Sequence, residues 1–204
     1  MREIEQSDQL GVRKTDLILQ DIETRQQEGL SKAGVTEQSD LTDIVRFSLA
    51  GEQYAIYASY ISSIHDLVAQ SLTIFPIPGM PNHILGVINL RGEIIPIVDL
   101  REFFSLPADP DLNSTQIINI KFEENQSSFS VGLLVDKVYG LAKKSKTEIQ
   151  PSLSTIEHIK ADYIEGEIYE ESGSDGEPSI VIGIINLGNV LLSEMGDRLD
   201  EYDT

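Results

Sequence analysis

The sequence contains no cysteine. This absence excludes disulfide bonds, thiolate metal sites and cysteine nucleophiles. The chain also lacks any apolar run long enough to cross a bilayer, and residues 1–20 are polar and acidic instead of a basic start followed by an apolar block. From these absences we expect a soluble, cytoplasmic protein without direct membrane insertion.

Positive charge is scarce. The chain has 15 lysines and arginines against 34 aspartates and glutamates, which gives a formal net charge of -19. Phosphate binding depends on clustered lysine and arginine, so this balance disfavours nucleic acid and anionic membrane surfaces as partners. The one basic cluster, residues 143–146, is interpreted as a solvated loop.

Groups suited to catalysis are also few. The three histidines, His65, His83 and His158, are scattered, and none has a metal-ligand spacing to another histidine or to a carboxylate. No glycine-rich phosphate loop is followed by Lys-Ser/Thr, and the carboxylates lie mostly in runs such as residues 165–171, which are typical of solvated strands or loops. We therefore expect a protein that is not an enzyme and that holds no cofactor and no metal.

What the chain has instead is a series of short, β-branched apolar segments. Two of them, Ile84–Leu90 and Ile94–Leu100, flank Arg91-Gly92-Glu93. So short a break predicts a β-hairpin, with Gly92 in the positive-φ position of its turn. Neither strand alternates cleanly between apolar and polar residues, so we expect both faces to be covered, as in a small closed barrel. Pro96 cannot donate to a ladder and predicts an edge or a bulge.

The residues after this hairpin have the pattern of a helix start. Asp99 can accept from the free amides of a first turn while Glu102 reaches back to form a capping box. Val98 and Phe103 can supply the hydrophobic staple. The pattern therefore predicts a short helix through Phe104.

Other segments complete a mainly β fold with short helices. Residues 58–67 have apolar residues three positions apart, which predicts a short helix or turn. Residues 187–199 are predicted as a C-terminal helix. Residues 183–188 repeat the pattern of residues 86–91, as two similar lobes would. Further strands are predicted at residues 44–51, 53–58, 115–122, 128–135, 138–142, 163–169 and 179–186.

The composition divides the chain into three parts. Residues 1–43 are rich in Gln, Glu, Asp and Ser, and we expect an N-terminal extension that is partly disordered and contains a short helix at residues 15–25. The apolar face of that helix can dock on the body of the protein or on a partner. Residues 44–199 form the predicted domain, and residues 200–204 are an acidic tail.

The central hairpin resembles the signature of the CheW family, the coupling proteins of bacterial chemosensory arrays. Members carry a segment of the form G-V-I-N-L-R-G-x-x-x-P-x-x-D-L, and the resemblance extends from about Val45 to Leu192. The matching residues are Gly86–Gly92, Pro96, Asp99-Leu100, the proline-containing approach Phe75–Gly79 and the strand Val131–Val138.

The resemblance implies a fold and a function. The fold would be two small SH3-like, five-stranded β-barrel lobes sharing a core. The protein would be a non-enzymatic adaptor in a chemosensory array near the inner membrane, serving chemotaxis or pilus-based motility. Its partners would be the helical cytoplasmic tip of a methyl-accepting chemoreceptor and the regulatory domain of a CheA-type histidine kinase.

The resemblance also implies receptor-binding residues. By position alone, Arg91 is a solvated turn residue, whereas the family pattern places it at the receptor-binding groove, where its guanidinium can pair with a carboxylate or carbonyl. Ile61 and Ile64 would offer apolar contact to a receptor helix. Ser63 lies in the same segment, where many members have glutamate, and Asn89 would hold the hairpin.

Two points stay open at this stage. No residues are assigned to kinase binding, and Asn186, which stands where an aspartate is common, is expected to be structural. The alternative function is a stand-alone CheW-like regulatory domain that binds a small ligand between its barrels. That alternative lacks a set of polar residues to orient a ligand.

Overall fold

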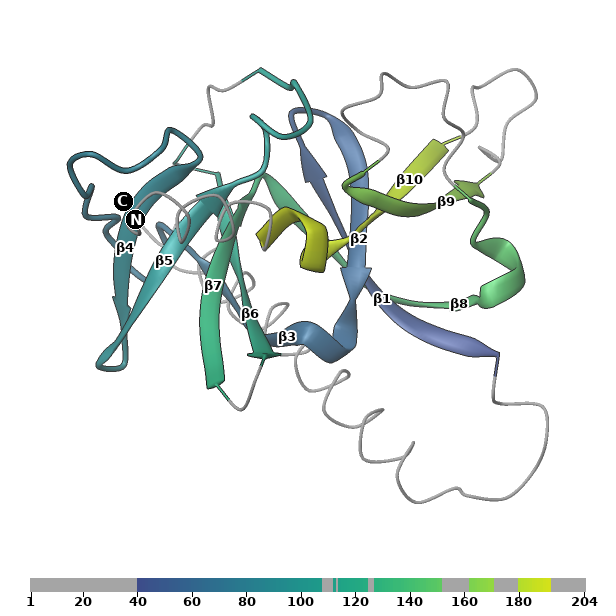
Figure 1. Cartoon of the computed structure of the whole chain (residues 1–204), viewed down its shortest axis with the longest axis horizontal. Helices are drawn as coiled ribbons and strands as arrows, with labels where there is room; N and C mark the ends of the chain where they lie inside the picture. The colour runs from purple at the N-terminus through teal and green to yellow at the C-terminus, as the bar shows by residue number, and fades with distance from the viewer. Residues whose placement is uncertain are drawn as a thin grey trace, which may run out of the picture.

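The computed structural model describes residues 40–107, 112, 114–124, 127–151, 162–170 and 180–191. These residues form ten strands in two five-stranded sheets, each belonging to one lobe (Figure 1). The predicted N-terminal helix and acidic tail lie outside the described residues. Within the described part of the chain, no helix is both long and apolar enough to span a membrane.

The first sheet, sheet A, combines strands from both ends of the domain. Its order is β8-β1-β2-β10-β9, with β10 parallel to β2 and the other neighbours antiparallel. The strands of sheet A are β1 (Leu41–Leu49), β2 (Glu52–Tyr57), β8 (Lys137–Ser145), β9 (Ile164–Glu170) and β10 (Ile180–Ile185).

The second sheet, sheet B, is formed by the middle of the chain. Its order is β3-β6-β7-β5-β4, again with one parallel pair, β5 and β7. The strands of sheet B are β3 (Ile61–Asp66), β4 (Ile84–Leu90), β5 (Glu93–Asp99), β6 (Gln116–Glu124) and β7 (Ser127–Val135). The two sheets confirm the mainly β, two-lobe prediction.

Neither ladder closes into a complete barrel, so the closed barrel of the sequence prediction is wrong. We call the lobe that contains sheet A lobe A and the lobe that contains sheet B lobe B. In each lobe, an isolated β-bridge joins one edge strand of the sheet to the segment that follows the opposite edge strand. Phe75 pairs with Val87 in lobe B, and Gln150 pairs with Glu167 in lobe A. The outer face of β5 is also open at the hairpin end, where Ile94 is 60% exposed.

The lobes repeat the same local arrangement after their parallel strand. The backbone N–H of Asp99 donates to the carbonyl of His83 at 2.8 Å, and that of Asn186 donates to the carbonyl of Tyr163 at 2.8 Å. Asn186 also caps the next turn, because its Oδ1 accepts from the backbone N–H of Asn189 at 3.0 Å. The internal repeat is therefore real, but it relates the end of β10 to the end of β5 and not to β4.

The helical predictions need two corrections. Residues 58–67 are a 3₁₀ turn, η1 (Ala58–Tyr60), followed by strand β3. The register of β3 against β6 shifts between Ile61 and Ser63, and this bulge places Ile61 and Ile64 on one face although they are three residues apart. A spacing of three therefore suggested a helix where the chain has a bulged strand.

The short helix expected after β5 is a series of turns through Ser105. The capping box does not form, because the N–H of Asp99 is already bonded to His83 and the Glu102 carboxylate lies 3.7 Å from the His83 ring. The C-terminal helix is present at Leu187–Leu191, where the description of this segment ends. The basic cluster is also more ordered than predicted: it ends strand β8 and continues into η2 (Lys146–Glu148).

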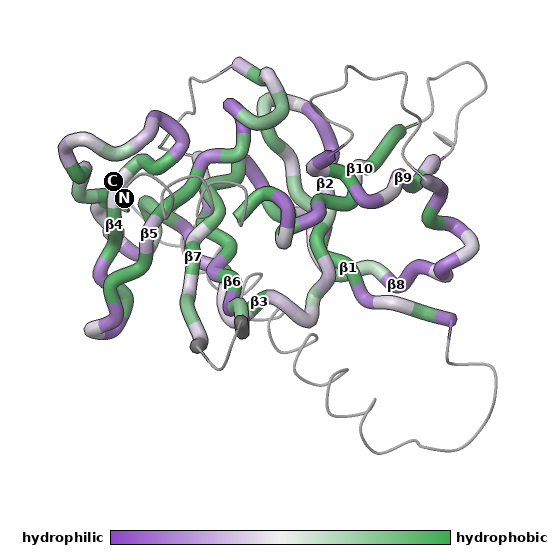
Figure 2. Tube along the Cα trace, in the orientation of Figure 1, coloured by the Kyte–Doolittle hydropathy of each residue, from purple (hydrophilic) through white to green (hydrophobic). Residues whose placement is uncertain are grey.

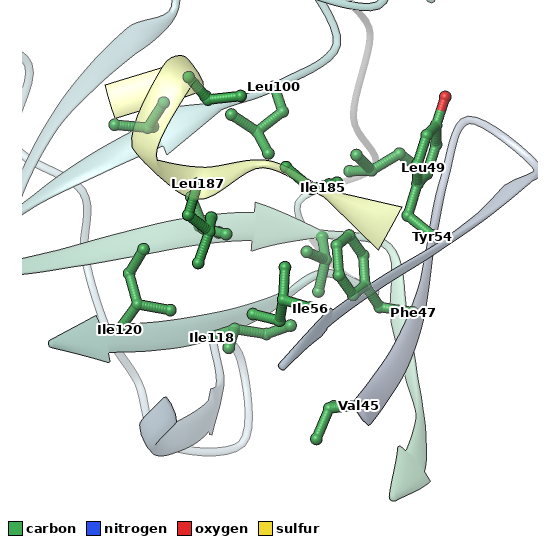
Figure 3. Close-up of a cluster of buried hydrophobic side chains, with 14 of the residues drawn as sticks. Val45, Phe47, Leu49, Tyr54, Ile56, Leu100, Ile118, Ile120, Ile185 and Leu187 are labelled. Atoms are coloured by element: carbon green, nitrogen blue, oxygen red, sulfur yellow. The ribbon is translucent and has the colours of Figure 1, made fainter. Parts of the chain in front are cut away.

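The main hydrophobic cluster lies between the lobes and contains residues from both sheets (Figure 3). Separate clusters fill the interior of each lobe. The strands of each sheet thus contribute residues both to the shared cluster and to the cluster inside their own lobe, which requires many hydrophobic residues. Figure 2 shows hydrophobic stretches in strands of both sheets. The labelled members of the shared cluster are Val45, Phe47, Leu49, Tyr54 and Ile56 from sheet A, Ile118 and Ile120 from sheet B, and Leu100, Ile185 and Leu187 at the strand ends.

Candidate functional site

The site begins at the two-residue turn between β4 and β5. Arg91 and Gly92 have φ of 55° and 94°, and Leu90 pairs with Glu93 across the ladder, which is the pattern of a type I′ hairpin. The Oδ1 of Asn89 accepts from the backbone N–H of Gly92 at 2.9 Å. The predicted hairpin and the positive φ of Gly92 are confirmed, and Asn89 holds the turn.

The backbone conformation of Arg91 is unfavourable for a residue other than glycine or asparagine. A left-handed conformation costs an ordinary residue on the order of 1–2 kcal/mol, whereas glycine or asparagine adopts it readily. Side-chain contacts do not offset this unfavourable energy, because the Arg91 side chain is exposed and makes no hydrogen bond or ion pair with any described residue. Strain of this kind concentrates at functional sites.

A polar cluster is centred on His65 and Ser63 of β3. The ring of His65 is hydrogen-bonded through Nδ1 to Gln70 Oε1 at 2.7 Å and through Nε2 to Ser63 Oγ at 2.8 Å. Asn119 on β6 donates to the same Ser63 oxygen at 3.4 Å. Ser63 is thus partly buried in a network rather than presented alone.

The pKa of His65 is lowered in the folded chain. Burial lowers this pKa from 6.5, the hydrogen bond to Gln70 opposes the change, and the charge of Arg91 lowers the pKa further. The charge of Arg91 therefore acts on His65 across the lobe, although β3 and the β4–β5 hairpin stand at opposite sides of sheet B.

Two of the predicted contact residues are placed differently. Ile61 and Ile64 are only 8% and 2% exposed and belong to the shared core. Their side chains therefore hold β3 against sheet A and do not offer apolar surface to a partner helix in this conformation. The receptor-binding role that the family resemblance implied for Ile61 and Ile64 stays a prediction.

A groove beside the hairpin supplies the apolar surface. It has a volume of about 730 Å³ and lies between the outer face of β4, β5 and β7 and the helix that follows β10. Glu93 and Ile94, which directly follow Arg91 and Gly92 in the chain, are among its lining residues. Its lining is mostly apolar: Met80, His83, Ile84, Glu93, Ile94, Pro96, Val98, Phe103, Ser128, Phe129, Ser130, Val131, Val190 and Leu191.

Sequence reasoning missed this groove because its walls come from segments far apart in the chain. One signal was available: Ile94, Pro96 and Val98 alternate along β5, as the residues of one strand face do. Among the described residues there is no group of three or more His, Asp or Glu side chains that could hold a metal ion.

The fold and the site together define a small two-lobed binding module with an apolar groove and a charged hairpin tip. Residues 43–194 match the family model described as "CheW-like domain". The chain belongs to the CheW family, whose members are scaffold proteins of chemotaxis signalling.

Individual relatives agree with this assignment. The chain is 26% identical to a chemotaxis protein CheW of Helicobacter pylori over 68% of this chain and 79% of that protein. It is 31% identical to a CheW of Bacillus subtilis over 52% of this chain and 64% of the relative. The crystal structure of the scaffolding protein TtCheW from Thermoanaerobacter tengcongensis superposes with a TM-score of 0.55 at 30% identity, covering 72% of this chain and 89% of that one.

Proposed function

We propose that this protein is an adaptor that couples the cytoplasmic tip of a chemoreceptor to a CheA-type histidine kinase. It would act in the cytoplasm, at a receptor array near the inner membrane. The observation that carries the proposal is the exposed Arg91, which makes no hydrogen bond or ion pair with any described residue and lies at the tip of a hairpin whose strand β5 lines an apolar groove.

The receptor would bind as an amphipathic helix. Its apolar face would enter the groove along Ile94, Pro96 and Val98, and an acceptor group on its polar edge would pair with Arg91. Asn89 would position Arg91 through the turn, and Ser63 would contribute through the His65 network beside it. Ile61 and Ile64 would act only indirectly, by supporting β3 from the core.

The test is a titration with a soluble fragment of the receptor tip. Arg91→Glu should weaken binding at least tenfold, about 1.4 kcal/mol, because it replaces the cation by a like charge facing the receptor's acceptor. Binding to the kinase regulatory domain should be unchanged in the same variant.

Arg91→Asn is the matched control for folding. Asparagine tolerates the left-handed conformation, so this variant should be more stable than the parent by about 0.5–1 kcal/mol in urea denaturation while still binding the receptor tip weakly. Parental affinity in both variants would remove Arg91 from the receptor-binding surface.

A further inference from the structure

A second arginine, Arg101, lies in the turns that follow β5, and it is buried. Its exposed fraction is 1%, and its guanidinium has carboxylates on two sides. Nη1 donates to Asp99 Oδ1 at 2.8 Å, and Nη2 donates to Asp136 Oδ1. Asp99 additionally accepts from the backbone N–H of Arg101 at 3.0 Å, so the turn is fixed at both its backbone and its side chain.

Asp136 carries this link from one lobe to the other. It lies between β7 of sheet B and β8 of sheet A, and its Oδ2 accepts from the backbone N–H of Ala50 at 2.6 Å. Its own N–H donates to the carbonyl of Ser48 at 2.9 Å. The two groups that Asp136 binds on this side, the N–H of Ala50 and the carbonyl of Ser48, both belong to the β1–β2 hairpin. Arg101 is therefore linked through Asp136 to sheet A.

The same turns pack between the lobes. Phe104 stacks on Tyr54 of β2 with ring centroids 4.8 Å apart, and Phe103 meets the ring of Tyr163, just before β9, edge-on at 5.3 Å. Phe103 also lines the groove. The position of these turns therefore determines both the contact between the lobes and one wall of the groove.

We infer that Arg101 is a positioning residue that holds sheet B in one orientation relative to sheet A and so sets the width of the groove. An apolar interface can slide over many similar arrangements, whereas a buried guanidinium must keep both carboxylate partners because a lone buried charge is strongly unfavourable. Apolar packing holds the lobes together, and the charge cluster selects one arrangement. The consequence for receptor binding depends on the proposed function; the orientation itself does not.

The absence of cysteine makes a direct test practical. Cysteines introduced at Lys121 on β6 and Lys143 on β8, both exposed, would carry spin labels, and pulsed electron paramagnetic resonance would give the distance between the sheets. The parent chain should give one narrow distance peak. Arg101→Met, which keeps the length of the side chain but not its charge, should broaden or displace that peak while circular dichroism stays that of a folded β protein.

Arg46→Met is the matched control. Arg46 is also an ion-paired arginine, but its partner Glu170 lies in the same sheet, at 2.8 Å. Its loss should leave the distance peak unchanged. Asp136→Asn is a milder second variant and should broaden the peak in the same way as Arg101→Met.

An unchanged peak in a folded Arg101→Met or Asp136→Asn protein would overturn the inference. Unfolding of both variants would also overturn it, because the cluster would then hold the fold itself rather than the orientation of two formed lobes. In a titration with the receptor-tip fragment, Arg101→Met should bind about tenfold more weakly. Arg91→Glu should lose binding with an unchanged distance peak, so failure of the receptor site and failure of this inference give different results.

Discussion

At the residue scale, the hydrogen bonds of His65 determine which ring nitrogen carries its proton. Gln70 Oε1 is an acceptor only, so Nδ1 of the neutral ring donates to it, and Nε2 accepts from the hydroxyl of Ser63. Protonation of Nε2 would force Ser63 to give up its donor role. It would also place a second positive charge near Arg91, inside a largely buried network.

His65 is therefore expected to make the fold sensitive to mild acid. Its folded-state pKa lies below the unfolded value of 6.5, so the unfolded chain binds the proton more readily. The stabilisation from neutral His65 is complete above pH 6.5 and is lost as the pH falls below it. Urea denaturation at pH 7.5 and 5.5 should show this loss, and His65→Gln should reduce the difference between the two pH values. An equal difference in parent and variant would assign the acid sensitivity to other groups.

At the element scale, each open sheet depends on one bridge and on a glycine next to it. In lobe B the bridge joins Phe75 to Val87 by two hydrogen bonds of 2.8 and 3.0 Å. Gly86 comes just before Val87 with φ of 140°, and a Cβ there would lie 2.2 Å from the carbonyl oxygen of Phe75. In lobe A, Gly166 precedes the bridging Glu167 in the same way. The glycines let the last strand approach the returning segment closely.

Gly86→Ala should consequently be severely destabilising, by about 3 kcal/mol or more, because it combines an unfavourable φ with a clash against backbone. Gly79→Ala is the matched control: its φ is 81°, but nothing lies within 4 Å of the added Cβ. That variant should lose only about 1 kcal/mol. Comparable losses in urea denaturation would show that the bridge is not what Gly86 protects.

In sheet A, ion pairs also link the two edge strands, β8 and β9. Lys144 on β8 bonds to Glu170 on β9 at 3.0 Å and to Glu148 at 3.4 Å, so charges join the two edge strands of the sheet. The hydrogen bond to Glu170 is the largest cause that raises the pKa of Lys144. Lys144 is the second residue of the basic cluster 143–146, which was predicted to be a solvated loop and here contributes to the link between the edge strands.

At the scale of the whole molecule, strand β1 begins at Leu41, three residues before residue 44, where the composition predicts the domain to start. The carbonyl of Asp40 accepts from the backbone N–H of Lys146 at 2.9 Å, and β1 pairs with β8 from Leu41 onward. A truncation after residue 43 would remove the first three pairs of that ladder. The length of the extension that can be removed is thus decided by β1 pairing and not by composition.

A chain that lacks residues 1–39 should fold and should bind the kinase regulatory domain with parental affinity in a titration. A chain that lacks residues 1–43 should have a lower urea midpoint, because Leu41, Thr42 and Asp43 no longer pair with β8. Loss of kinase binding in the shorter truncation would instead assign the extension to the kinase interface.

By itself the sequence determined the strands and the family of this protein. Apolar runs separated by turn residues predicted the β4–β5 hairpin, its Gly92 turn and the position of Arg91 at the tip, because these depend on neighbours in the chain. The signature around that hairpin was specific enough to indicate the CheW family and the two-lobe fold. Local patterns failed where a long-range contact took over a local partner, as when His83 took the N–H of Asp99 from the expected capping box.

Only the tertiary structure decided which surfaces are available. Burial of Ile61 and Ile64 follows from a bulge in β3 and from packing between the lobes, neither of which leaves a local pattern. The groove, the effect of the Arg91 charge on the pKa of His65 and the link from Arg101 through Asp136 to Ala50 each join residues distant in sequence. Pairing of distant segments depends on the curvature and docking of whole sheets, so it becomes visible only when the lobes are assembled.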